Sequence, residues 1–225
     1  MKLQGYYIDI EPALKYGEIV LNYPAPQNHN WLNDTTFLIA YGKVTGNKDA
    51  KLLETYMIKV HNELYEKTKE DEFEFKGALN NVTAEYMSAI DHFDTNKIYS
   101  IKSDFLFFSS YDFKNNSLPI QWTVTSLQSV VNINGYYDRS IDLVLLNSNS
   151  FSNLSISQEN ANMLIKRRKD EFGSVNRKLY SVINFKVTSK GLQKDYKAIP
   201  ANITSIDCYE YDNYEYNYLG TIEPK

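Results

Sequence analysis

The chain has 225 residues and a formal net charge of −4, from 24 Lys and Arg against 28 Asp and Glu. A monomer of this size hides about 70% of its surface on folding, which is enough for a core without crosslinks. The single cysteine, Cys208, excludes an internal disulfide, and the mild acidity argues against a nucleic-acid partner.

A short helix is the first predicted element. Asn33 or Asp34 is its expected N-cap, and the helix should end before Thr45-Gly46-Asn47. Asn47 is then a suitable N-cap for the helix that follows.

Two apolar stripes at helical spacing come next. The first consists of Leu53, Met57, Val60 and Leu64, and the second of Phe75, Leu79, Val82, Tyr86, Ala89 and Phe93. The stripes predict helices at about 48–66 and 71–93, packed antiparallel, with one long bent helix as the alternative. We expect Val82, Tyr86 and Leu64 to be buried.

After about residue 96 the sequence becomes rich in aromatic and β-favouring residues, which is typical of strands. A turn at 114–117 should separate a strand within 98–113 from one at 118–125. Asn134-Gly135 is a strong hairpin signal between strands at 130–133 and 141–146. Further strands are predicted at 179–187, 203–211 and 214–222.

One more helix interrupts these strands. Ser157 is its expected N-cap, and the helix should run from Gln158 to about Glu171, before Gly173. Its expected buried side consists of Ala161, Leu164, Ile165 and Phe172.

This order of elements predicts an α+β fold, in which an N-terminal helical layer packs on a mostly antiparallel β-sheet with one further helix. We expect a single domain over residues 1–225, with a helical part at about 1–95 and a β-rich part at about 96–225. Each part alone would leave one apolar face uncovered.

The sequence contains no motif that assigns a catalytic residue, a metal site or a cofactor, and we expect none of them. Glu54 and His61, like Glu85 and His92, are seven positions apart and share a helix face, so a His/Glu metal cluster between two helices is one interpretation. Hydrogen-bonded histidines are the preferred interpretation. Cys208 has acidic neighbours and is expected to be an inert core thiol.

Lys166-Arg167-Arg168-Lys169 is the one basic run in the chain. A solvated helix end that complements the helix dipole is the simpler interpretation. A patch for phosphate or lipid headgroups, extended by Arg177 and Lys178, is the alternative.

The C-terminal stretch alternates tyrosine with polar residues. A turn at Asp212-Asn213 would pair Tyr211 with Tyr214 and Tyr209 with Tyr216, and would place all four rings on one face. Glu210 and Glu215 would then face each other on the opposite side. The four tyrosines either cover the core or form an exposed aromatic platform for a sugar or peptide. They are the candidate ligand-binding residues.

Two stretches of the second half carry a family resemblance. The first is Tyr111-Asp112-Phe113 with Leu118-Pro119, and the second, within 143–180, combines Ser155-x-Ser157, Ala161, Leu164 and Arg177-x-Leu179. With these motifs the sequence resembles uncharacterised bacterial exported domains of unknown function. The resemblance implies a bacterial source and export, and it implies no activity.

From these observations we expect a non-catalytic bacterial binding or accessory module of the cell envelope, whose partner is a protein or an envelope polymer. A hydrolase that acts on an envelope polymer through paired carboxylates, such as Asp9 with Glu11 or Glu210 with Glu215, is the first alternative. An acidic cytoplasmic inhibitor of a basic protein is the second. No run of residues is long and apolar enough for a transmembrane helix. The expected location is periplasmic or otherwise exported if Met1 replaces a signal peptide, and cytoplasmic if it does not.

Overall fold

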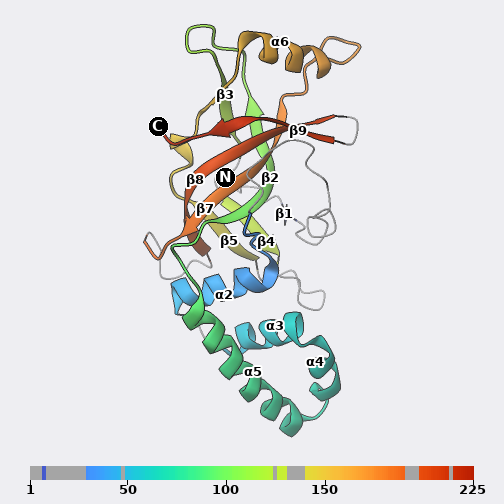
Figure 1. Cartoon of the computed structure of the whole chain (residues 1–225). Coiled ribbons are helices and arrows are strands. Elements are labelled where there is room, and N and C mark those ends of the chain that lie inside the picture. The colour runs from blue at the N-terminus through green and yellow to red at the C-terminus, as the bar shows by residue number, and fades with distance from the viewer. Residues whose placement is uncertain are drawn as a thin grey trace, which may run out of the picture.

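The structure is a computed structural model, and it describes residues 7–8, 29–46, 49–123, 126–130, 140–190, 198–212 and 215–225. Four of its helices precede the main strands, and one follows later in the chain (Figure 1). The helices are α2 (Asp34–Thr45), α3 (Ala50–Val60), α4 (Asn62–Thr68), α5 (Glu72–His92) and α6 (Gln158–Arg167). The fold is α+β with the helical layer at the N-terminal side, as predicted.

Most of the remaining described residues belong to one mostly antiparallel sheet. Its spatial order is β1-β4-β5-β8-β7-β2-β3-β6, and β9 pairs with β8. Only the pairs β1–β4 and β5–β8 are parallel. The strands are β1 (Tyr7–Ile8), β2 (Tyr99–Phe108), β3 (Ser117–Trp122), β4 (Ser126–Val130), β5 (Ser140–Leu145), β6 (Asn153–Ser155), β7 (Lys178–Val187), β8 (Ala198–Asp212) and β9 (Glu215–Ile222).

Strand β8 organises the sheet because it is long enough to have two neighbours on one side. Its first residues pair with β5 and its last residues with β9, while β7 runs along the other side. The sequence pattern indicated only residues 203–211 of this strand. Strands β4 and β5 pair antiparallel in the register Val130 to Ser140, and the predicted Asn134-Gly135 turn lies outside the described residues.

The strands curl until β6 lies close to β9. A Cβ added to Gly220 of β9 would be 3.1 Å from the Leu154 side chain of β6. The curved sheet encloses a core of fully buried side chains, and α6 adds Ala161 and Leu164 to it. The largest sheet residues in this core are Phe108, Leu106, Leu118, Leu143, Leu154 and Phe185.

Helices α3, α4 and α5 extend beyond one end of the sheet, with α2 between them and the strands (Figure 1). Backbone hydrogen bonds from Leu32 to Ser100 and from Ser100 to Asn30 tie the start of the helical part to β2. Helix α5 contacts α2, α3 and α4. One contiguous cluster of buried apolar side chains runs from these helices into the sheet. The assignment of residues 1–225 to a single domain stays a prediction.

The helix predicted at about 48–66 divides in two at His61. This residue has φ −129° and ψ 48°, and it separates α3 from α4. After the break, Tyr65 of α4 is buried while Leu64 is exposed, and Val60 at the end of α3 is exposed as well. The prediction that Leu64 is buried is therefore wrong, whereas Val82 and Tyr86 are buried as expected.

Side-chain caps define four helix starts. Asn33 caps α2 and Ser157 caps α6, as predicted. Asp49, rather than the predicted Asn47, caps α3, and Asp71 caps α5. Helix α6 ends at Arg167 rather than near Glu171. The chain then folds into a tight loop, and Phe172 is exposed, not buried.

Candidate functional site

The C-terminal hairpin has a different register from the predicted one. Asp212 pairs with Glu215, Tyr211 with Tyr216, and Tyr209 with Tyr218. The predicted Asp212-Asn213 turn is therefore wrong, because Asp212 is itself paired in the hairpin. The shift moves each partner by two positions, and an even shift keeps every side chain on its predicted face.

Three tyrosine rings gather on this face of the sheet, and we call them the tyrosine patch: Tyr180 of β7, Tyr211 of β8 and Tyr216 of β9. The ring centroids are 5.5 Å apart for Tyr180–Tyr211, 5.4 Å for Tyr180–Tyr216 and 4.8 Å for Tyr211–Tyr216. Tyr211 is 39% exposed, and the other two are half-buried. Because the rings support one another on adjacent strands, the patch presents a preorganised aromatic surface.

Of the four candidate tyrosines, the structure brings Tyr211 and Tyr216 into the patch and places Tyr209 beneath it. Tyr214 lies outside the described residues. Sequence reasoning missed Tyr180, although its alternation with Val182 along β7 already put both on one strand face. Whether these rings bind a ligand stays a prediction.

Tyr209 is the buried support of the patch. It packs on Val182 and lies 5.6 Å, between ring centroids, from Tyr218. Burial raises the pKa of its phenol, and the nearby Asp207 carboxylate adds to the increase. Its hydroxyl has no hydrogen-bond partner among the described residues. A buried hydroxyl of this kind is a polar group for which a ligand or water would be a favourable partner.

A polar network orients the ring of Tyr218, which packs beside Tyr209. The Thr221 hydroxyl donates to the buried Asp207 carboxylate over 2.5 Å and lies 2.6 Å from the Tyr218 hydroxyl. Asn184 donates to the other Asp207 oxygen over 2.9 Å and accepts from Ser100 over 2.7 Å. Buried polar groups that satisfy one another in this way hold β2, β7, β8 and β9 in a fixed arrangement.

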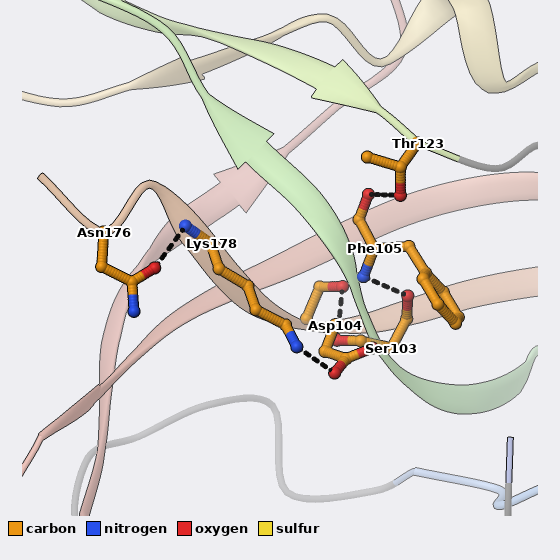
Figure 2. Close-up of polar contacts among 7 residues, drawn as sticks. Ser103, Asp104, Phe105, Thr123, Asn176 and Lys178 are labelled. Carbon is orange, nitrogen blue, oxygen red and sulfur yellow. Dashed lines mark hydrogen bonds and ion pairs between the residues drawn. The ribbon is translucent and has the colours of Figure 1, made fainter. Parts of the chain in front are cut away.

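A bulge in β2 places an ion pair at the border of the patch (Figure 2). The pairing with β7 shifts register between Ser103 and Leu106, and Asp104 in this bulge meets Lys178 at 2.5 Å. The Lys178 ammonium also lies 5.9 Å from the centre of the Tyr180 ring. The tyrosine patch therefore has a charged rim next to its aromatic surface.

Glu210 does not belong to a carboxylate pair. It faces Asn217 in the hairpin, not Glu215 as predicted, and its side chain is fully buried on the core side of β8. There the Arg167 guanidinium of α6 binds it at 2.5 Å. This ion pair removes the proposed Glu210–Glu215 site, and Asp9 with Glu11 lies outside the described residues.

The two helical histidines have separate partners. His61 Nε2 is 2.8 Å from Glu85 Oε2, and the Tyr56 hydroxyl donates to the other Glu85 oxygen. His92 instead donates through Nδ1 to the Ser88 carbonyl. Glu85 thus pairs with His61 rather than with His92, and in the described part of the chain no group of three or more His, Cys, Asp or Glu gathers to hold a metal.

Cys208 is a buried thiol in the core. It is fully buried, and this burial raises its pKa. A thiol that stays protonated and out of solvent is a poor nucleophile.

The described residues line two solvent-open pockets of similar size. One of about 510 Å³ lies where α2, α5 and β2 meet, and its wall includes Trp31, His92, Lys97 and Tyr99. The other, of about 470 Å³, adjoins Trp122 and Arg177. Neither of these two pockets brings two carboxylates together.

Residues 49–167 match the family described as Domain of unknown function (DUF4852), and the chain belongs to this family. The match extends from α3 through α6 and so includes both helices and strands. It confirms the resemblance to domains of unknown function.

No curated protein and no solved structure matches the chain. None of the helices in the described residues combines the length and the apolar character that a membrane span requires.

Proposed function

We propose that the protein is a non-catalytic binding or accessory module of the bacterial cell envelope, and that the tyrosine patch holds its ligand, an envelope polymer or a partner protein. One observation carries the proposal. Tyr211 is exposed while it packs against Tyr180 and Tyr216 on three paired strands. Aromatic rings held rigidly at a surface bind a partner with little loss of conformational entropy.

The chemistry of the patch suits a ligand with alternating apolar and polar groups. Tyrosine offers a ring face for the apolar side of a sugar or side chain and a hydroxyl for hydrogen bonds. The Asp104–Lys178 pair at the rim adds charged groups within reach of the same ligand.

The structure favours binding over hydrolysis. A two-carboxylate hydrolase needs two acids on either side of a substrate cleft, with environments that separate their roles. Glu210 is instead engaged by Arg167 in the core, and the two pockets described above do not contain a pair of acids.

Single tyrosine variants test the proposal. We expect Tyr211→Ala and Tyr180→Ala to remain folded and to reduce co-sedimentation with purified bacterial cell-wall sacculi at least about tenfold, because each removes a contacting ring. Phe73→Ala, which truncates an exposed ring far from the patch on α5, is the matched control and should bind normally.

Tyr209→Ala distinguishes a tyrosine that stabilises the fold from tyrosines that contact the ligand. This change empties a buried site and should reduce the free energy of unfolding by about 3–5 kcal/mol. If Tyr211→Ala destabilised the protein equally, the patch would be part of the core and the proposal would fail. Wild-type protein that binds neither sacculi nor any protein from the same envelope fraction would also contradict it. The envelope location is tested by fractionating cells that express the natural gene and detecting the protein in each fraction.

A further inference from the structure

Two loops at one end of the molecule share the same construction. In the β2–β3 loop, Asp112 Oδ1 accepts hydrogen bonds from the backbone N–H groups of Lys114 and Asn115. In the α6–β7 loop, Asp170 Oδ1 accepts from the backbone N–H groups of Phe172 and Ser174. Each loop is therefore braced internally by one aspartate at its base.

Each braced loop presents a phenylalanine to solvent. Phe113, directly after Asp112, is 69% exposed, and Phe172, two residues after Asp170, is 85% exposed. Exposed phenyl rings are unfavourable in water, and the hydrogen bonds within each loop hold its backbone in the turn that carries the ring. The construction suits rings that are buried only when the molecule meets another surface.

Both loops lie beside α6, at the end of the molecule opposite α3, α4 and α5 (Figure 1). Ile156, just before α6, donates a backbone hydrogen bond to Asn116 in the first loop. The second loop follows α6 directly, where Asn176 donates to the Arg168 carbonyl. These backbone contacts place the two phenylalanine loops at opposite ends of the same helix.

This end of the molecule is locally basic. Within 109–116 and 157–178 the cations are Lys114, Lys166, Arg167, Arg168, Lys169, Arg177 and Lys178, and the carboxylates are Asp112, Glu159, Asp170 and Glu171. Glu210 and Asp104 neutralise Arg167 and Lys178. A positive balance remains, in a chain whose net charge is −4. Arg168 and Arg177 each also retain a buried guanidinium nitrogen without a hydrogen-bond partner among the described residues.

We propose that this end docks on an anionic lipid surface, with Phe113 and Phe172 inserted at the boundary between headgroups and acyl chains, and with the exposed Lys166 and Lys169 at the C-terminal end of α6 on the phosphates. Apolar insertion and electrostatic attraction to anionic lipid add to each other in peripheral membrane binding, and the two phenylalanines and the nearby lysines supply both. The inference is independent of the tyrosine patch, which lies on β7, β8 and β9.

Vesicle co-sedimentation tests the inference directly. The full chain should bind vesicles in which about a third of the lipid is phosphatidylglycerol, bind phosphatidylcholine vesicles weakly, and lose affinity as salt screens the charges. Phe113→Ala or Phe172→Ala should each reduce the affinity about tenfold, and the double variant should reduce it further. Lys166→Glu combined with Lys169→Glu should abolish the preference for anionic lipid.

Matched controls use residues at the other end. Phe73→Ala truncates a ring that is 88% exposed on α5, and Lys76→Glu reverses an exposed charge there, so both should bind vesicles as the wild type does. Thermal melts should show that all of these surface variants remain folded.

The inference fails if the wild-type chain does not bind anionic vesicles, or if the phenylalanine double variant binds them as well as the wild type. It also fails if the phenylalanines are needed instead for self-association, measured by sedimentation equilibrium without lipid. That result would identify this end as a protein interface.

Discussion

Arg167 of α6 and Glu210 of β8 form an ion pair although 43 positions separate them in the chain. The carboxylate is almost completely shielded from solvent, whereas the guanidinium side chain is 45% exposed. The Arg167 side chain therefore extends from the surface inward, and its guanidinium group binds a carboxylate in the core. The pair therefore attaches α6 to the sheet.

Removal of the arginine should be costly. Arg167→Ala leaves the Glu210 carboxylate buried without its cation, and we expect a loss of about 2 kcal/mol in the free energy of unfolding, reduced from a fully buried pair by the exposure of Arg167. Urea denaturation measures it. Arg167→Ala combined with Glu210→Gln should recover part of the loss, and a double variant that is as unstable as the sum of both single variants would contradict the coupling.

The break at His61 gives a contrast between two apolar residues. Val82→Asp introduces a charge into the packed face of α5 and should destabilise the protein by several kcal/mol. Leu64→Asp, at a position 37% exposed on α4, should change the stability by about 1 kcal/mol or less. Thermal melts of both variants provide the measurement. Equal effects would mean that α4 packs its Leu64 face inward.

Two glycines should respond to alanine with opposite signs. A Cβ at Gly42 of α2 would be 2.4 Å from the Tyr86 hydroxyl, and this ring is held by its hydrogen bond to the Leu38 carbonyl. Gly42→Ala should therefore push α5 away from α2 and destabilise by about 1–3 kcal/mol. Gly77→Ala has open space around it on α5 and should stabilise by about 0.5–1 kcal/mol. Chemical denaturation of the two variants distinguishes the effects, and a stabilising Gly42→Ala would contradict the close α2–α5 contact.

Alkaline pH should destabilise the helical part through Tyr56. Burial, helped by the hydrogen bond to Glu85 and the charge of Glu85, raises the pKa of Tyr56 to about 12. Because an unfolded tyrosine has a pKa of about 10, the folded state binds this proton more tightly. The resulting stabilisation is complete below about pH 10 and is lost as the pH rises from about 10 to 12.

Tyr56→Phe tests this pH dependence. The variant lacks the titrating hydroxyl, so its stability should decline less steeply over the same alkaline range when unfolding is followed by circular dichroism. Phenolate absorbance should also show one fewer late-ionising tyrosine. An unchanged slope would mean that Tyr56 ionises in the folded protein as it does in a free chain.

Local patterns in the sequence determined the fold class and many of its elements. The caps Asn33 and Ser157, the buried stripe that contains Val82 and Tyr86, and the strand periods after residue 96 all depend on neighbours within a few positions. The prediction that Tyr209, Tyr211 and Tyr216 share one face is correct although the predicted turn is wrong, because an even shift of register leaves each side chain on the same face.

Only the tertiary structure decided which distant residues meet. The alternation along the hairpin placed Glu210 opposite Glu215, whereas in the structure Arg167 of α6 reaches Glu210 and allows it to be buried. Tyr180 entered the patch because β7 pairs with β8, and Glu85 met His61 because α5 packs on α3. The periodicity of a sequence indicates which face of its own helix or strand a side chain occupies. It does not indicate which other helix or strand packs against that face, because long-range packing and charge pairing determine that choice.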